Sequence, residues 1–201
     1  FSVPYFVDNQ TIIKYDGNDN KLIENIKKVC VAYTDKEIEA IVRDMPILKN
    51  YSEQRKENLK DVAIIWRDHF LEENVGLLLS FVRMGVNPKD ILAIDKGDST
   101  KHRAEITETF KKLGFQVEIL DNTAVAEDIL LEDGKKFITE FIENRKDKKI
   151  IILDDGAIVS KILTLHTYNN VKAFVELTVT GLKRIKELDE KSLSAKASFI
   201  L

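Results

Sequence analysis

The chain has 201 residues, of which 44% are hydrophobic and 32% are charged, and its formal net charge is -3. A chain of this length can bury a substantial core, and its interspersed basic and acidic residues argue against nucleic acid as a partner. The single cysteine, Cys30, excludes an internal disulfide, and no apolar run is long enough to span a membrane.

The residues at the two ends of the chain bear on the cellular setting of the protein and on whether the chain is a fragment. Residues 1–4 lack the basic and apolar regions of a signal peptide, so we expect a reducing, cytoplasmic setting. Residues 197–201 form an apolar run that is typical of the beginning of a strand, whereas termini are usually polar unless they dock. We therefore expect the chain to be a fragment of a longer protein.

Residues 1–50 differ in character from the rest and predict an N-terminal arm with helices that pack on the core. A hairpin or arm is expected over 5–15, and helices are expected near 21–31 and 34–44. The region 21–44 could pack on a neighbouring subunit, although surface helices have the same pattern. A homo-oligomer therefore stays open.

From residue 61 onward, short runs rich in Ile and Val alternate with helical patterns. This alternation is typical of βαβ units with right-handed crossovers. The predicted strands are 61–66, 90–94, 116–120, 149–153 and 171–176, and the predicted helices are 71–84, 101–113, 123–144, 157–165 and 178–190. We expect residues 51–201 to form a flavodoxin-like, doubly wound α/β domain with a mainly parallel sheet of about five strands.

Three turns at the carboxyl ends of predicted strands hold most of the candidate chemistry, because ligands of open α/β sheets bind there. The first turn carries His69 and Glu73, whose spacing of four residues would place them on one face of a helix start. A second turn carries Asp154 and Asp155, and the third carries Glu176, Thr178 and Thr180 near a helix N-terminus. A fourth polar turn, 95–100, is looser.

Each of these features also has a purely structural explanation. A lone His at a strand end is more often a hydrogen-bonded structural group than a catalyst, and paired Asp residues commonly cap turns. Thr178 is a good N-cap for the last helix whatever else it does. His102 and His166 are interpreted as helix-surface or helix-end residues, and nothing beside Cys30 indicates an activated thiolate.

The ordered set of motifs resembles the substrate-binding domain of adenosylhomocysteinase over roughly residues 43–188. No single motif is decisive, but their order and approximate spacing are moderately specific. The matching positions are Met45-Pro46-x-Leu48, Arg55, His69-x-x-x-Glu73, Ser99-Thr100, Ile152-Leu153-Asp154-Asp155-Gly156 and Thr178-x-Thr180-Gly181.

The resemblance implies a fold, an activity and roles for these residues. Enzymes of this family use tightly bound NAD to oxidise a ribose hydroxyl, eliminate homocysteine, add water and reduce the product to adenosine. By this resemblance, His69 would be the active-site histidine and Glu73 the residue that reads the adenine edge. Asp154 and Asp155 would lie near the ribose, and Thr178 and Thr180 would match two of three consecutive threonines.

The chain departs from the family pattern at several of these positions. Leu71 stands where the family has a threonine, and the family's pair of glutamates is reduced to Glu176-Leu177. Lys101-His102 and Ala157-Ile158 replace further family residues, and the family's catalytic lysine and downstream aspartate are not found. No G-x-G-x-x-G fingerprint occurs, so we expect no cofactor within this chain, NAD only if a downstream domain exists, and no metal.

Three hypotheses remain open. In the first, the chain is the substrate-binding domain of a divergent adenosylhomocysteinase-like enzyme that binds a nucleoside or S-adenosylhomocysteine-like ligand, with His69 and Asp155 as catalytic residues and Glu73, Asp154, Glu176, Thr178 and Thr180 binding the substrate. In the second, it is a small-molecule binding or interaction module that has kept the fold without the chemistry. A weaker third is a domain of a hydroxyacid-dehydrogenase-like enzyme. As an isolated chain, the protein should be silent towards S-adenosylhomocysteine.

Overall fold

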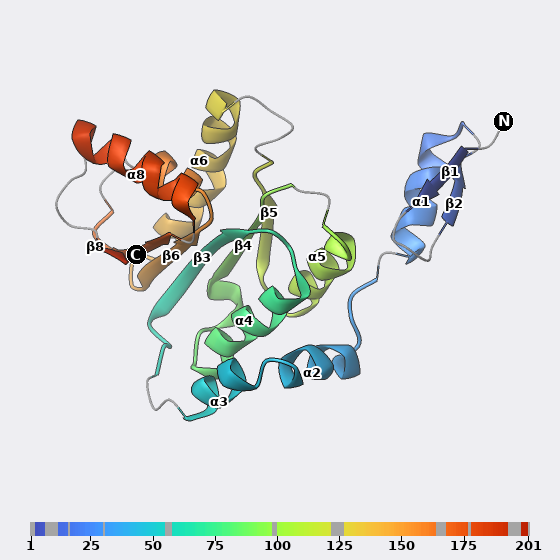
Figure 1. Ribbon diagram of the computed structural model, residues 1–201, viewed down its shortest axis with the longest axis horizontal. Helices are drawn as coiled ribbons and strands as arrows, with labels where there is room; N and C mark the ends of the chain where they lie inside the picture. The colour runs from blue at the N-terminus through green and yellow to red at the C-terminus, as the bar shows by residue number, and fades with distance from the viewer. Residues whose placement is uncertain are drawn as a thin grey trace.

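A six-stranded sheet forms the centre of the protein, in the computed structural model (Figure 1). The structure describes residues 3–6, 12–15, 17–29, 31–54, 58–97, 100–121, 127–163, 168–176, 178–192 and 198–200. The strands of the sheet are β3 (Val62–Asp68), β4 (Ile91–Asp95), β5 (Gln116–Ile119), β6 (Lys149–Asp154), β7 (Val171–Glu176) and β8 (Ser198–Ile200). All neighbouring strands are parallel, so the predicted doubly wound α/β fold is confirmed.

The strand order is β5-β4-β3-β6-β7-β8, which is 3-2-1-4-5-6 when the strands of this sheet are counted along the chain. This is the order of the dinucleotide-binding doubly wound fold, whereas flavodoxin has the other common order, 2-1-3-4-5. Hydrophobic periodicity predicts strands but not the side on which each new strand is added. The order reverses between β3 and β6, and that reversal defines the switch point of the sheet.

Helices follow the strands of the sheet and cover both of its faces. They are α4 (Glu72–Arg83), α5 (Arg103–Lys112), α6 (Glu127–Glu143), α7 (Ile158–Leu163) and α8 (Val179–Ser192), with a short 3-10 helix, η1 (Pro88–Asp90), before β4. The five predicted strands and the five predicted helices that follow them are confirmed. The first residues of one predicted helix, 123–126, lie outside the described residues. So does the segment 164–167, which contains His166.

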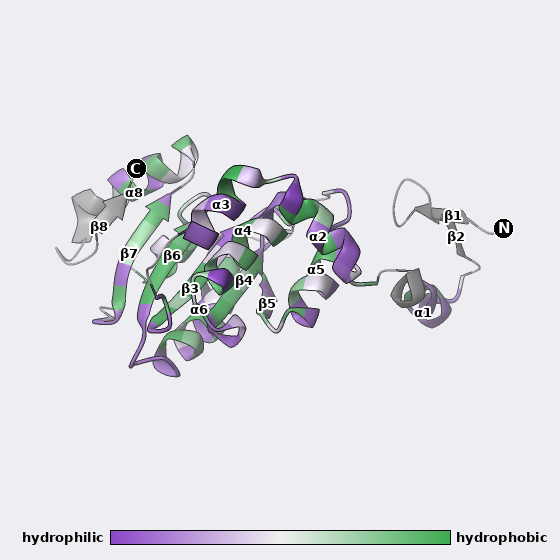
Figure 2. Cartoon of the chain, turned by 90° about the horizontal axis from the view of Figure 1, so that it is seen from below, coloured by the Kyte–Doolittle hydropathy of each residue, from purple (hydrophilic) through white to green (hydrophobic). Residues whose placement is uncertain are grey.

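Strand β3 is buried on both faces because its alternate side chains pack into two separate hydrophobic cores. Ala63 and Ile65 belong to a core with residues of α6 and α7, whereas Ile64 and Trp66 belong to a core with residues of α4 and α5. The central strands accordingly show hydrophobic colour in Figure 2. A helix on each side is what the near-continuous apolar run of a central parallel strand requires.

Aromatic side chains close the core beneath the turn that follows β3. The Trp66 and Phe70 rings stack with their centroids 5.7 Å apart, and the Phe110 ring meets Phe70 edge-on at 4.9 Å. Because Trp66 and Phe70 flank the turn, their burial holds both ends of it. The backbone that carries His69 is therefore supported by packing from below.

The N-terminal elements form a hairpin and three helices. Strands β1 (Val3–Phe6) and β2 (Ile12–Tyr15) pair antiparallel and lie beside α1 (Asp19–Val29), away from the sheet in Figure 1. Helices α2 (Asp35–Arg43) and α3 (Pro46–Gln54) lie against α4. The predicted hairpin and two helices are confirmed, α3 was not predicted, and the division at residue 50 stays a prediction.

None of the helices among the described residues combines the length and the apolar character that crossing a membrane would require.

Candidate functional site

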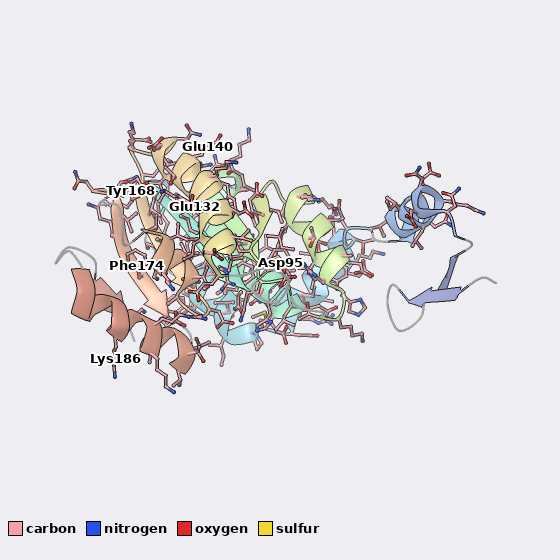
Figure 3. All side chains as sticks on the ribbon, turned by 90° about the horizontal axis from the view of Figure 1, so that it is seen from above. Asp95, Glu132, Glu140, Tyr168, Phe174 and Lys186 are labelled. Carbon is pink, nitrogen blue, oxygen red and sulfur yellow. The ribbon has the colours of Figure 1, made fainter. Side chains whose placement is uncertain are left out.

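Three polar side chains meet at the switch point, each from the carboxyl end of a different strand. Strand register brings them together, because Asp68 pairs with Asp95 between β3 and β4, so that His69 and Lys96 both come one residue after this pair. Arg67 is paired with the last residue of β6, so that Asp155 follows at the same edge. Asp95, labelled in Figure 3, marks the end of β4 from which Lys96 extends.

The three side chains form a compact charged triangle, which we call the His69–Lys96–Asp155 cluster. Lys96 Nζ donates to Asp155 Oδ2 at 2.6 Å and lies 3.3 Å from His69 Nε2. The remaining side of the triangle, from His69 Nε2 to Asp155 Oδ2, measures 3.5 Å. The His69 side chain is 38% exposed, against 14% for Lys96 and 9% for Asp155, so the cluster opens to solvent on the His69 side.

Asp68 lies directly behind His69. Its Oδ1 accepts a hydrogen bond of 2.7 Å from the main-chain N–H of His69. Burial raises the pKa of the Asp68 carboxyl, an effect opposed by that hydrogen bond and reinforced by the negative charge of Asp155. The turn is held further by Asn74, whose side-chain amide donates to the His69 carbonyl at 2.7 Å, and by Thr100, whose hydroxyl donates to the Phe70 carbonyl at 2.9 Å.

Asp68, His69 and Asp155 could also hold a metal ion, although no metal was expected from the sequence. Each offers one ligand atom, and these atoms lie within 4.8 Å of one another. However, the ammonium of Lys96 already donates to Asp155 at 2.6 Å and supplies the positive charge that a metal would bring. The negative charge of Asp155 is therefore balanced by a side chain of the protein itself, Lys96.

A fully buried arginine supports the cluster from inside the sheet. Arg67 Nη1 donates to the Asp155 carbonyl at 2.6 Å, and Arg67 Nη2 donates to the Leu120 carbonyl at 3.2 Å. The carboxylate oxygen Asp154 Oδ1 lies 3.8 Å from Nη1. Arg67 thus fixes the main chain of Asp155 and places a positive charge beside Asp154.

Asp154 is buried and serves the protein's own backbone. Its Oδ2 accepts from the Ser160 N–H at 3.1 Å, within the first turn of α7, while Oδ1 is buried and accepts no hydrogen bond from the described residues. Burial raises the pKa of Asp154 to about 6, and the neighbouring Arg67 charge limits this rise. The side chain that was predicted to bind substrate therefore does not reach the open side of the site.

The end of β7 is likewise tied to the protein's own backbone. Glu176 Oε1 accepts from the N–H and hydroxyl of Thr178, both at 2.7 Å, and from the N–H of Gly156 at 3.1 Å. Thr178 in turn caps α8, because its hydroxyl accepts from the Gly181 N–H at 3.1 Å. Arg184 of α8 donates from Nη1 to the Gly156 carbonyl at 2.6 Å. These bonds join the turns after β6 and β7.

The turn after β6 has an unusual backbone. Gly156 and Ala157 both have positive φ, at 94° and 56°, and Ala157 is fully buried. A left-handed conformation costs an L-residue about 1–2 kcal/mol, and such strain often accompanies functional sites. The turn accepts this strain at Ala157, a residue with a Cβ in the left-handed conformation.

The structure brings together only some of the predicted site residues. His69 and Asp155 meet, whereas Glu73 and Thr180 are exposed and make no hydrogen bond or ion pair with the cluster in the described part of the chain. The expectation that His69 and Glu73 share a helix face is wrong, because α4 begins at Glu72 and its N-cap, Leu71, is extended. Leu177, Ser99 and Arg55 lie outside the described residues.

We did not predict a place in the site for Lys96, Arg67, Asp68 or Arg184. Lys96 belonged to a turn that was interpreted as a loose polar loop, and its partners come from other strands. Arg67 did carry a signal, because a cation at the end of an otherwise apolar run is costly to bury and needs dedicated partners. Those partners, two main-chain carbonyls, cannot be read from the sequence.

In comparisons with known proteins, no family model and no curated protein matched this chain. The fold and the geometry therefore define a class only: a doubly wound parallel α/β protein with a charged cluster at its switch point.

Proposed function

We propose that the protein binds a nucleoside-like small molecule at the carboxyl ends of β3, β4 and β6, as the substrate-binding domain of a divergent adenosylhomocysteinase-like enzyme. The observation that carries this proposal is the meeting of His69 and Asp155 at the switch point, 3.5 Å apart and open on the His69 side. Ligands of doubly wound sheets bind in this crevice.

The chemistry of the crevice favours a ligand with hydroxyl groups over one with phosphates. Asp155 and His69 can bond to hydroxyls, while the first turn of α4 carries Glu72 and Glu73 and no glycine-rich loop precedes it. Two carboxylates at a helix N-terminus oppose the binding of a pyrophosphate there. NAD, which the proposed enzyme would need, would be supplied by another domain.

Calorimetric titration with adenosine and S-adenosylhomocysteine tests the proposal. We expect the wild type to bind at least one of them, and His69→Ala and Asp155→Ala to weaken that binding about tenfold or more, because each removes a polar partner of the ligand. Asp128→Ala, an exposed carboxylate on α6, is the matched control and should bind as the wild type does. Equal affinity in all four proteins, or no heat from the wild type with either compound, would refute the proposal.

A second candidate is a binding module without catalysis. It is favoured by the hydrogen bonds that Asp154, Glu176 and Thr178 make to the protein's own backbone, which leave fewer side chains for a reaction. The two candidates differ in turnover: a full-length protein that contains an NAD domain and releases adenosine from S-adenosylhomocysteine would be the enzyme. Binding without release in that protein would identify the module.

A further inference from the structure

We infer that Lys96 sets the arrangement of the cluster: its ammonium donates to His69 Nε2, which keeps the imidazole proton on Nδ1, and it orients Asp155 so that this carboxylate selects a ligand that donates hydrogen bonds. The second half of this inference, on ligand selection, rests on the proposed function. The first half does not. Lys96 is not among the positions at which the chain resembles adenosylhomocysteinase, so its role follows from the geometry alone.

The donor properties of lysine decide the arrangement. An ammonium group has three donors and no acceptor. Lys96 Nζ donates to Asp155 Oδ2 at 2.6 Å, and His69 Nε2 lies 3.3 Å from the same ammonium, within reach of a second donor. An atom that accepts a hydrogen bond from an ammonium must offer a lone pair, so in the inferred arrangement Nε2 carries no proton and the imidazole proton is on Nδ1.

The main chain on both sides of Lys96 restricts where its side chain can lie. Its side chain is 14% exposed, and its own main-chain N–H donates to the Asp68 carbonyl at 3.2 Å, which continues the pairing of β4 with β3. The next residue, Gly97, has φ +88° and leaves no room for a Cβ, which would come within 2.0 Å of Asp121. Because the main chain is held on both sides of Lys96, its ammonium is directed to His69 and Asp155.

The consequence is that Asp155 supplies the acceptor for a ligand hydroxyl. The single lone pair of His69 Nε2 already faces the Lys96 ammonium, so a ligand hydroxyl donates to the carboxylate of Asp155, whereas a methyl ether at the same position cannot donate at all. Sites built to bond a hydroxyl discriminate strongly against analogues that lack the donor. Adenosine should therefore bind in preference to its 2'-O-methyl and 3'-O-methyl derivatives.

The ligand-independent test is the tautomer of His69 by nitrogen-15 NMR. In the wild type, we expect the ring nitrogen coupled to both carbon-bound protons, Nε2, to have the shift of an unprotonated nitrogen. In Lys96→Met, which matches the length of the side chain without its charge, Nε2 should take up the proton and donate to Asp155. Lys96→Arg should keep the wild-type pattern, and loss of signals in His69→Gln assigns them. A protonated Nε2 in the wild type, or an identical pattern in Lys96→Met, would overturn the inference.

The ligand-dependent test is calorimetry with adenosine and its two O-methyl derivatives. We expect the wild type to prefer adenosine over at least one derivative by about tenfold, and this preference to shrink toward unity in Lys96→Met. If the wild type binds adenosine but Lys96→Met keeps both affinity and preference, the inference fails while the proposed function stands. If the wild type binds none of the three, the proposed function fails, and the NMR experiment still decides the role of Lys96. Circular dichroism confirms that each variant is folded.

Discussion

Arg67 and Asp155 lie 88 positions apart in the chain and are joined by a buried hydrogen bond of 2.6 Å, from the guanidinium Nη1 to the main-chain carbonyl. This bond orients the turn after β6, so that the Asp155 side chain faces Lys96 and His69 while its carbonyl faces inward. The charge of Arg67 also lies beside the buried Asp154. One buried cation therefore links the stability of the sheet to the geometry of the site.

Arg67→Met should destabilise the protein strongly. It removes two hydrogen bonds to buried carbonyls and leaves Asp154 without its positive neighbour, and breaking a buried charge pair typically costs about 3–5 kcal/mol. Arg43→Met is the control, because Arg43 is 75% exposed and pairs only at the surface, with an expected cost below about 1 kcal/mol. Urea denaturation measures both free energies of unfolding. A loss for Arg67→Met no larger than that for Arg43→Met would contradict the buried network.

The pairing of Arg67 with Asp154 makes a further prediction for a double variant. Asp154→Asn removes the buried negative charge, so in its presence the loss of Arg67 should cost less than it does in the wild type. A double-mutant cycle in urea gives the coupling free energy between the two residues. Strictly additive losses would show that the 3.8 Å approach between Nη1 and Oδ1 carries no energy.

Asp154 should also contribute to the pH dependence of the free energy of unfolding. Its pKa is raised by burial from 3.8 to about 6, so the folded state binds the proton more tightly than the unfolded state. The contribution of Asp154 to stability is therefore present below the unfolded value, near 3.8, and is lost as the pH rises through about 6. Each unit of such a shift corresponds to about 1.4 kcal/mol.

The measurement is the difference in unfolding free energy between Asp154→Asn and the wild type across this range. Other carboxylates cancel in the difference, including Asp35, Glu37, Asp61 and Glu127, whose pKa values are lowered. The variant should gain on the order of 2–3 kcal/mol relative to the wild type between the lower and upper ends of the range. A difference that is constant with pH, or that moves the opposite way, would show that burial does not govern Asp154.

Two glycines with the same backbone conformation allow the cost of that conformation to be measured separately from the cost of a steric clash. Gly97 and Gly114 have φ of +88° and +89°, but a Cβ at Gly97 would lie 2.0 Å from Asp121, whereas one at Gly114 would lie 3.4 Å from Pro88. Both alanine variants should pay for the left-handed conformation, and Gly97→Ala should lose a further 1–3 kcal/mol, roughly, to overpacking. Thermal unfolding compares them. Equal losses would mean that the turn after β4 can move, and with it the backbone of Lys96.

The extent to which the sequence predicted the fold follows from what periodicity can encode. The Ile-rich run of β3 and the alternation with α4 mark a buried parallel strand, and the burial of Ile64 and Ile65 in opposite cores bears this out. The strand order could not be predicted, because β6 returning to the other side of β3 is a choice of long-range packing. The short α3 was missed because its exposed Ile47 and Tyr51 give no clear apolar face.

The same limit applies to the candidate site. His69 and Asp155 could be predicted because each follows a strand, and parallel strands end at one edge. Lys96 also follows a strand, but nothing in the sequence distinguishes it from the other polar residues of the turn 95–100. Its contact with His69 and Asp155 depends on the register that pairs Asp68 with Asp95. The spacing of His69 and Glu73 misled because the periodicity of a helix applies only inside it, and α4 begins after His69.

An NMR titration of the side-chain signals of His69 with adenosine would show whether a nucleoside binds at the switch point. We expect the imidazole signals of His69 to shift in proportion to binding, while those of His102, at the start of α5, stay in place and serve as an internal control. Saturable binding of adenosine with no change at His69, or shifts of equal size at both histidines, would contradict a ligand site at the switch point.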